Sequence, residues 1–530
     1  MGLFAVLELR LRASDPGASD QLLEMRRREG DRLEVAPTLV FAVSALSEER
    51  VVLDVAVGPP QRIELAIGER ARFAFEFTEC VLRLIAIRSI DARTLPGSTP
   101  LERELLAAIR AAPDDDQPRI VYADWLLSQS SRSDCERGEL IQLQCARLKA
   151  GNAEQRRAIR ARERALIVAH PPPSLGEGIR LELAWSRGFL ERCRGEFLHF
   201  AQNVTKVFEV APSLSILDLE ITGWGINQSL IGRLASIEEM AQIRDLSIVA
   251  APTVHYGDAN DVLIRLVPAL TSLRRLRLRA SALSLAGIEG LLGARVCPQL
   301  ALLDLSGNTI DQVMARALAE STQLEPSILR LADCAFGPAQ VEILGSSSWF
   351  AELEELDLGT NSLRDDGAIA LSKVPFKRLR TLAIGSCKIG KTGGAALLAS
   401  HHLAKLRCLR VHGNPIGDGA AKALAKSRLR SIQDLDMHTC AIREAGARAL
   451  ADSTNLRALR RLQLGGNRIG DGGARAIAES QGLPNLEKLE VVNCGISDDG
   501  ARALLATSLR RIVLSTGELS EEIKTQLRDR

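Results

Sequence analysis

Asparagine and cysteine alternate at a fixed spacing along the C-terminal part of this chain. Eight such positions follow one another at steps of 26 or 27 residues: Asn308, Cys334, Asn361, Cys387, Asn414, Cys440, Asn467 and Cys494. Each closes the pattern L-x-x-L-x-L-x-x-N/C-x-L, as in Leu353, Leu356, Leu358, Asn361 and Leu363. A unit of this length cannot bury its apolar side alone, so the period indicates stacked repeats rather than an ordinary globular core.

The repeats extend from about residue 210 to residue 530 and form about twelve units. The first three and the last are degenerate, as capping repeats usually are, with the alternating position held by Thr222, Ala251, Ser281 and Gly517. Each unit pairs a short strand with a helix, such as residues 446–451 or 472–478. We therefore expect an α/β solenoid shaped like a horseshoe, with a parallel concave sheet and convex helices.

The alternating side chains have a structural explanation. Asparagine and cysteine at this position are expected to bond to backbone groups of the loops, and reduced cysteines suffice for that role. No C-x-x-C pair is present, so a zinc or redox site has little support. Asp418, Asp471 and Asp498 lie where helix caps are needed.

The alternation, the unit length and the full helix in each unit resemble the ribonuclease-inhibitor-like class of leucine-rich repeats. The unit is slightly shorter than in the type member, so the resemblance is to the class. In that class the concave face binds proteins. The resemblance therefore implies a partner protein and directs attention to the exposed positions of the strands.

A first stripe of concave positions lies between the second and third apolar residues of each strand. Its members are Arg277, Asp304, Arg330, Asp357, Ala383, Arg410, Asp436, Gln463 and Glu490. Adjacent strands lie about 4.8 Å apart, so these residues should be lateral neighbours. We favour an ion-pair ladder over a charge pattern for a partner, although the two are compatible.

A second stripe is mostly small and should leave a shallow floor. It contains Arg279, Ser306, Ala332, Gly359, Gly385, His412, His438, Gly465 and Val492. His412 and His438 should lie side by side, and we favour a polar contact patch over a metal site because Arg410 repels cations and a third ligand is not evident. Arg274, Arg275, Arg277 and Arg279 form the best electrostatic anchor. The candidate partner-binding residues are therefore Arg277, Arg279, Asp304, Arg330, Asp357, Arg410, His412, Asp436, His438, Gln463 and Glu490.

Residues 1–92 read as a small β-rich domain of no family that we identify. Apolar or alternating runs at 4–11, 39–46, 51–57, 62–67, 71–77 and 81–87 predict six short strands in a sandwich or barrel. A folded cap and an adaptor are equally open as its role.

A helical module follows the linker 93–100. Residues 104–148 resemble the bacterial repeat-companion domain, which accompanies leucine-rich and other repeats. The resemblance rests on Leu105, Leu106, Ile109, Pro113, Asp114, Asp116, Arg119, Tyr122, Ala123, Asp124, Trp125, Leu126, Arg137, Glu139, Leu140, Ile141, Leu143 and Gln144, and more weakly on Arg187-Gly188-Phe189. It supplies context and no reaction, and we assign 101–200 to this domain and its connector.

Two features of this module have a functional and a structural explanation. Asp114, Asp116 and Asp124 lack the spacing of a calcium loop, so helix capping and packing are favoured over a metal or acid–base site, and Trp125 is expected in the core. The basic segment 147–164 has no aromatic residue to stack on bases, which favours a solvated helix face over nucleic-acid binding.

Composition points to no special environment. The net charge is +2, aromatic residues make up 3%, and no apolar run is long enough for a membrane helix. We expect a cytoplasmic monomer without cofactor or metal, bound to neither nucleic acid nor membrane. No catalytic motif stands out, so a non-catalytic protein-binding scaffold is favoured. A GTPase-activating protein, or an enzyme inhibitor with the same class of repeats, is the alternative.

Overall fold

The computed structural model describes residues 3–12, 21–28, 32–36, 39–46, 50–56, 61–66, 70–75, 78–89, 100–112, 115–149, 153–221, 228–250, 258–515 and 519–528. The chain divides into two units, Met1–Glu163 and Arg164–Arg530. We call the alternating asparagine–cysteine position of each repeat its ladder position. Three residues at this position lie outside the described residues: Thr222, Ala251 and Gly517. Pro113 and Asp114 also lie outside them.

The N-terminal part of the first unit contains two four-stranded antiparallel sheets, in the orders β2-β1-β8-β7 and β3-β4-β5-β6. The strands are β1 Leu3–Arg12, β2 Gln21–Arg28, β3 Arg32–Ala36, β4 Leu39–Leu46, β5 Arg50–Ala56, β6 Gln61–Ala66, β7 Arg70–Phe75 and β8 Thr78–Ser89. Six of them match the predicted runs. Strands β2 and β3 were not predicted, because their charged residues interrupt the alternation that marks a strand.

Four helices follow: α1 Pro100–Ala111, α2 Gln117–Leu127, α3 Arg132–Lys149 and α4 Ala153–Ala169. Helix α2 buries Arg119, Tyr122, Ala123 and Leu126. The Tyr122 hydroxyl donates a 2.8 Å hydrogen bond to Glu102, and its ring stacks on Trp125 at 5.6 Å. Trp125 itself is only half-buried, so its prediction as a core residue was wrong. The tyrosine occupies the centre because its hydroxyl finds a partner there.

The charged residues of this module have structural contacts. Asp124 accepts a 2.7 Å bond from Gln142, while Asp116 stands at the start of α2 without a side-chain cap. Asp115 instead accepts from the backbone N–H of Gln117 at 2.9 Å. The arginines of the basic segment that belong to α4 are exposed, as expected for a solvated face; they are Arg156, Arg157, Arg160, Arg162 and Arg164.

The second unit is built on one fourteen-stranded sheet. It starts with an antiparallel hairpin, β9 Leu181–Ser186 and β10 Phe189–Glu196, whose turn places Arg187 and Gly188 at positive φ. Parallel strands then follow in chain order: β11 Ile216–Ile221, β12 Asp245–Ala250, β13 Arg275–Arg279, β14 Leu302–Asp304, β15 Ile328–Arg330, β16 Glu355–Asp357, β17 Thr381–Ala383, β18 Cys408–Arg410, β19 Asp434–Asp436, β20 Arg461–Gln463, β21 Lys488–Val491 and β22 Arg511–Leu514.

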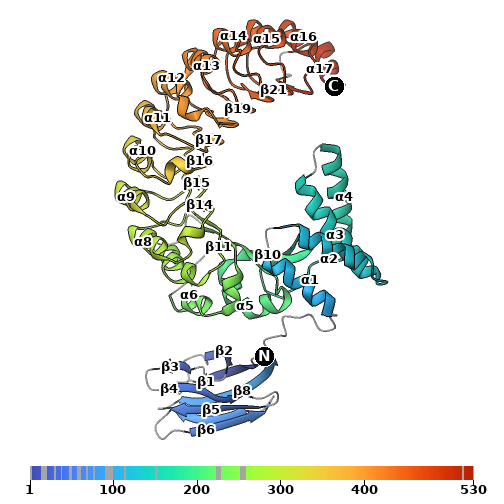
Figure 1. The fold of residues 1–530 in the computed structure, drawn as a ribbon, viewed down its shortest axis with the longest axis vertical. Helices are drawn as coiled ribbons and strands as arrows, with labels where there is room; N and C mark the ends of the chain where they lie inside the picture. The colour runs from blue at the N-terminus through green and yellow to red at the C-terminus, as the bar shows by residue number, and fades with distance from the viewer. Residues whose placement is uncertain are drawn as a thin grey trace. The chain divides into compact units, whose positions relative to one another are not determined.

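Helices cover the outer side of this sheet, so that the second unit forms an open arc with strands inside and helices outside (Figure 1). They are α5 Phe197–Val210, α6 Gln228–Ala235, α7 Asp258–Asp261, α8 Leu285–Gly293, α9 Gln312–Glu320, α10 Pro338–Gly345, α11 Arg364–Lys373, α12 Lys391–Ala399, α13 Gly417–Lys426, α14 Glu444–Ala451, α15 Gly470–Ala478, α16 Asp498–Leu505 and α17 Glu521–Arg528. The predicted solenoid is confirmed. No helix of the described residues is both long and apolar enough to cross a bilayer.

The asparagine–cysteine ladder bonds to loop backbone, as predicted. Asn361 accepts from the N–H groups of Cys334 and Phe336, both at 2.9 Å, and its amide donates to the carbonyls of Leu331 and Leu358 at 2.7 and 2.8 Å. The Cys387 thiol donates to the Leu358 carbonyl at 3.0 Å. Each ladder residue therefore contacts the preceding repeat and satisfies buried groups that water cannot reach.

Aspartates at helix starts link the repeats in the opposite direction. Asp418, in the first turn of α13, accepts from the N–H groups of Arg443 and Gly446 in the next repeat, at 2.7 and 3.1 Å. Asp471 contacts Ser497 and Gly500 in the same way, at 2.8 and 3.2 Å. The predicted capping role is correct, but the capped helix belongs to the following repeat.

Candidate functional site

The candidate residues of the first stripe lie in one row across the inner sheet. Backbone pairing aligns Arg277 with Asp304, and the row continues strand by strand to Glu490; its other members are Arg330, Asp357, Ala383, Arg410, Asp436 and Gln463. The predicted lateral neighbourhood is therefore confirmed. Arg279 is exposed at the end of β13.

The expected ion-pair ladder along this row is wrong. Within the part of the chain that the structure describes, no ion pair joins two members of the first stripe. Arg330 instead pairs with Glu355 at 2.7 Å, two residues before its neighbour Asp357. Asp304 and Asp357 turn back to accept the backbone N–H two residues later, at 3.0 and 2.9 Å. The hydrogen bond from an aspartate to the backbone of its own turn is favoured over an ion pair with the next strand, because it fixes fewer side-chain torsions.

The arginine patch on β13 is partly neutralised. Arg277 and Arg275 both pair with Asp245 of β12, which is 7% exposed. Only Arg274 and Arg279 in this patch lack an ion pair among the described residues. The patch is thus a weaker electrostatic anchor than the sequence indicates.

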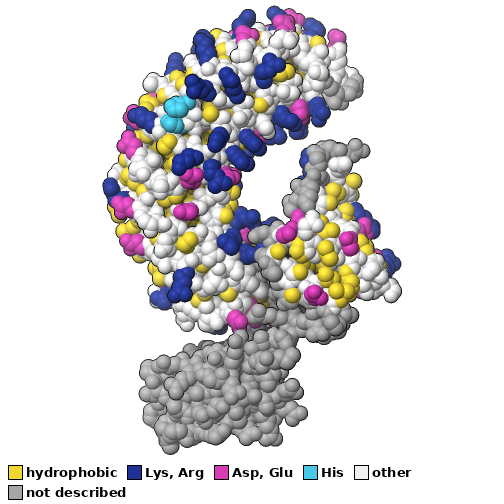
Figure 2. Space-filling model, viewed as in Figure 1, with side chains coloured by type: hydrophobic (Ala, Val, Ile, Leu, Met, Phe, Trp, Pro, Cys, Tyr) yellow, Lys and Arg dark blue, Asp and Glu magenta, His cyan; other side chains and the backbone are white. Residues whose placement is uncertain are grey.

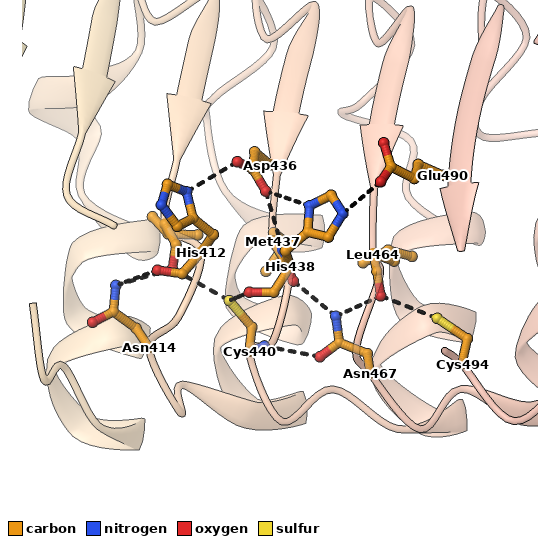
Figure 3. A network of polar contacts seen from close by, with 11 residues as sticks. His412, Asn414, Asp436, Met437, His438, Cys440, Leu464, Asn467, Glu490 and Cys494 are labelled. Atoms are coloured by element: carbon orange, nitrogen blue, oxygen red, sulfur yellow. Dashed lines mark hydrogen bonds and ion pairs between the residues drawn. The ribbon is translucent and has the colours of Figure 1, made fainter. Parts of the chain in front are cut away.

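The histidines and their carboxylates form one connected network at the C-terminal ends of β18–β21. Asp436 lies between the two rings: its Oδ2 is 3.0 Å from His412 Nδ1, and its Oδ1 is 2.9 Å from His438 Nδ1 (Figure 3). His438 Nε2 lies 2.9 Å from Glu490 Oε1, two strands away. These four candidate residues, which we name the histidine–carboxylate network, are therefore brought together by the fold.

Glycines of the second stripe make room for the rings. A Cβ at Gly465 would lie 2.5 Å from His438 Cδ2, and one at Gly385 would lie 2.3 Å from His412 Nε2. Real atoms do not approach this closely. The His412 ring therefore covers Gly385, and the His438 ring covers Gly465. Because these glycines lie on opposite sides of the two histidines, the rings point away from each other and do not lie side by side as predicted.

The network sets the protonation of His438. Partial burial lowers the pKa of this imidazole, but hydrogen bonds to the carboxylates of Asp436 and Glu490 outweigh that effect and raise the pKa above its usual value. With a carboxylate on each ring nitrogen, the doubly protonated form satisfies both contacts as a donor. The raised pKa therefore favours the protonated form of His438 between the two carboxyl groups.

The network presents hydrogen-bonding side chains at a partly exposed surface. In the described residues, both rings bond to carboxylates, and no serine, threonine or cysteine hydroxyl or thiol is bonded to either ring. The described residues also contain no group of three or more His, Cys, Asp or Glu side chains arranged to hold a metal ion. The side chains of His412, His438 and Glu490 remain 44%, 29% and 37% exposed, so a partner can reach them.

The family model described as Leucine Rich repeat matches five segments of the chain: 353–372, 379–398, 402–425, 455–478 and 482–505. These segments coincide with strands and helices of the solenoid. The protein contains leucine-rich repeats.

Three known proteins are similar to parts of this chain. The chain is 29% identical to ribonuclease inhibitor of Sus scrofa over 252 residues, which cover 44% of this chain and 54% of the inhibitor, so it spans about half the length of that relative. Among solved structures, an internalin of Listeria monocytogenes aligns with a TM-score of 0.37 and 16% identity, over 62% of this chain and 92% of the internalin. A chain of the yeast Rad7–Elc1 complex aligns with a TM-score of 0.40 and 16% identity, over 58% and 78%.

Sequence reasoning missed the residues that hold the candidate site in place. Gly385 and Gly465 were read only as a floor, and Asp245 was not singled out as the partner of Arg277. The signal for the network was present in the motif Asp436-x-His438 followed one repeat later by Gly465. The reach of Glu490 across β20 has no signal in the sequence, because it depends on the side-chain rotamers.

Proposed function

We propose that the repeat array is a non-catalytic scaffold that binds another protein through the concave face of its sheet. The observation that carries the proposal is the histidine–carboxylate network. Its polar groups are partly exposed and are held in one geometry by hydrogen bonds at 2.9 and 3.0 Å. Groups ordered before binding lose less conformational entropy when a partner docks, so such a patch suits recognition.

The candidate contact residues follow from the same argument. Arg410 is exposed on β18 beside Asp436, and Gln463 continues the row on β20. With the network, they form a continuous polar surface over β18–β21. We assign lesser roles to Asp304 and Asp357, because their carboxylates take no part in the histidine–carboxylate network.

Enzyme inhibition is the second candidate function. The supporting observation is the 29% identity to a ribonuclease inhibitor over 252 residues. Ribonuclease activity measured at increasing concentrations of the chain tests it directly. A loss of activity that saturates at one chain per enzyme would favour inhibition over a general scaffold.

The organisation of the chain is part of the proposal. We assign residues 1–92 to a small β domain, 101–200 to a repeat-companion domain with its connector, and 210–530 to the repeats. All nine cysteines for which the structure gives a state are free thiols. This supports a reducing compartment, and we propose the cytoplasm. We further propose a monomer that contacts neither nucleic acid nor membrane.

Site-specific photo-cross-linking tests the concave face. A photoreactive amino acid is placed at Gln463 on the inner sheet or, as a control, at Lys422, which is exposed on the outer helix α13. Each full-length variant is irradiated in the native cell, and adducts are identified by mass spectrometry. We expect a protein adduct at position 463 and none at position 422.

The result that would overturn the proposal is an adduct that forms only from the outer helix. Substituting Asp436→Ala, His438→Ala and Arg410→Glu in the cross-linking chain sharpens the test. These changes remove the network and reverse its neighbouring charge, so the adduct at position 463 should weaken. An undiminished adduct in all three would mean that the partner does not use this surface.

A further inference from the structure

A second surface lies at the opposite end of the same strands. It consists of the first residue of each strand β17–β21 together with the residue before it. We name it the basic strip after its five cations, Arg380, Arg407, Arg460, Arg461 and Lys488, which face only two carboxylates, Asp434 and Glu487. Figure 2 shows Lys and Arg side chains gathered along the inner side of this part of the arc.

The strip is separated from the arginine patch of β13 by three strands that lack a cation at these positions, and on its other side it borders Arg510 and Arg511 at β22. The equivalent positions of β14–β16 hold no cation; they are Ala301, Leu302, Ser327, Ile328, Glu354 and Glu355. The strip therefore begins abruptly at β17. A solvated surface that needed charge only for solubility would have no reason to segregate one sign to one end of five neighbouring strands.

Internal pairing leaves most of the strip free. Arg461 pairs with Asp434 at 2.5 Å, and Arg460 lies 3.5 Å from Glu487. Both carboxylates are used in these contacts. Arg380, Arg407 and Lys488 are exposed, and among the described residues none of them has an ion-pair partner.

The free cations stand at the two ends of a hollow of about 370 Å³. Arg407, just before β18, and Lys488 of β21 line it, with Gln433, the two paired arginines and their carboxylate partners Asp434 and Glu487 between them. Three strand spacings separate β18 from β21, which is about 14 Å. An extended peptide advances about 3.4 Å per residue, so two carboxylates four residues apart would reach both cations.

We propose that the basic strip binds an acidic segment of the partner protein, with one carboxylate on Arg407 and another on Lys488. The inference rests on the proposed function and adds the chemistry of the partner. The hollow receives the residues between the two anchors. Gln433 supplies both a donor and an acceptor for the backbone of the segment.

A protein segment fits this surface better than a nucleic acid does. No aromatic side chain is among the strip positions, so bases have nothing to stack on. Asp434 and Glu487 lie between the cations and would repel a continuous phosphate backbone. A peptide can present its carboxylates at intervals and place neutral residues opposite these two anions.

The test measures binding of a fluorescent twelve-residue serine peptide, with Glu at every fourth position, to the full chain by anisotropy. The matched peptide has Gln in place of Glu. The strip variant is Arg407→Glu with Lys488→Glu. The control variant is Lys422→Glu with Arg475→Glu, which makes the same charge change at exposed positions of α13 and α15. Circular dichroism establishes that both variants fold.

We expect the Glu peptide to bind, the Gln peptide to bind at least tenfold more weakly, and the strip variant to lose at least tenfold in affinity. The control variant should bind within about twofold of the original chain, and affinity should fall as salt is added. Equal losses in both variants would show a response to net charge and overturn the proposal. A twelve-nucleotide single strand that binds more tightly than the peptide, and is released by the strip variant, would overturn it in favour of nucleic acid.

The failure of this inference is distinguishable from the failure of the proposed function. Unchanged peptide affinity in the strip variant overturns the inference alone, because cross-linking at position 463 does not depend on the strip. If adducts are absent at position 463, the proposed function fails whatever the peptide does. If the partner is still cross-linked at position 463 in the strip variant, the proposal that the concave face binds a protein is supported, and the proposal of an acidic segment is overturned.

Discussion

The carboxylate of Asp418 in one repeat accepts a 3.1 Å hydrogen bond from the backbone N–H of Gly446 in the helix of the next. The same oxygen accepts from Arg443 at 2.7 Å. Gly446 is required for this approach, since a Cβ there would lie 2.5 Å from the oxygen. The helix cap therefore needs both the carboxylate of Asp418 in one repeat and the glycine at position 446 in the next.

A double-mutant cycle tests this coupling. Asp418→Ala should lower the free energy of unfolding by about 1 kcal/mol, the usual loss for a helix cap. Gly446→Ala should lower it by about 1–3 kcal/mol, because the new methyl group collides with the carboxylate and with Ile442 at 2.8 Å. In the double variant one collision is gone, so the combined loss should be smaller than the sum by about 1 kcal/mol. Additive losses in urea denaturation would show that the two residues act independently.

The ladder asparagines should contribute far more stability than the ladder cysteines. Asn361→Ala removes five hydrogen bonds and leaves buried backbone groups unpaired, so we expect a loss of about 3 kcal/mol or more. Cys387→Ala removes one weak bond from a thiol to the Leu358 carbonyl and should cost about 1 kcal/mol. Thermal denaturation of the two variants side by side checks the order. Equal losses would contradict the assignment of the backbone bonds to asparagine.

The histidine–carboxylate network should make stability depend on pH. The pKa of His438 is raised above 6.5 in the folded chain, so the protonated ring stabilises the fold fully below about pH 6.5. This contribution is lost as the pH rises through the folded-state pKa. Histidine side-chain NMR should show the raised pKa, and the original chain should lose more stability than His438→Asn between pH 6 and pH 8. Parallel pH profiles of the two proteins would contradict the prediction.

Gly465→Ala tests whether the glycine seats the ring. Its methyl group would lie 2.7 Å from His438 Nε2 and should push the ring away from Glu490. The pKa of His438 should then move back toward 6.5. Gly359→Ala is a matched control on the same stripe, because its methyl group would contact Asp357 Oδ1 at 3.2 Å, which a small shift of that side chain relieves, and would touch neither histidine. An unchanged titration in the Gly465 variant would exclude this role.

The ladder thiols should be chemically inert in the folded chain. Burial raises the pKa of Cys334 and Cys440 to about 12 and that of Cys387 and Cys494 to about 11. The thiolate is the reactive form, so alkylation by iodoacetamide at pH 8 should wait for unfolding. Mass spectrometry of peptides from native and urea-treated protein measures it. Rapid alkylation of Cys440 without urea would show that the ladder opens in the native state.

The repeats were predictable because their apolar period fixes the geometry of the sheet. Once Leu356 and Leu382 occupy equivalent positions, Asp357 and Ala383 must be neighbours. Backbone register follows from such a pattern without any knowledge of side-chain torsions. The same reasoning gave the alignment of the first stripe across the strands, which the backbone pairing confirms, while the binding role of these residues stays a prediction.

Side-chain partners were not predictable from the register. Asp357 could bond to a neighbouring strand or to its own turn, and the two choices differ by about 1 kcal/mol or less. The orientation of the His438 ring, which lies over Gly465 and contacts Glu490, likewise depends on side-chain rotamers and on the absence of a Cβ at Gly465. In the helical module, Trp125 was expected in the core because of its size, but Tyr122 is buried there instead and its hydroxyl donates a hydrogen bond to Glu102.

The alternation of asparagine and cysteine gives the array a repeat length of 53 residues, since Asn308, Asn361, Asn414 and Asn467 follow one another at that distance. Removing one unit would place two asparagines or two cysteines in adjacent repeats. Each of these residues would then face a loop that contacts the other residue type in the present array. Removing two restores every contact. The protein should therefore be shortened or lengthened by pairs of repeats. Duplications that preserve folding should likewise add an even number of repeats.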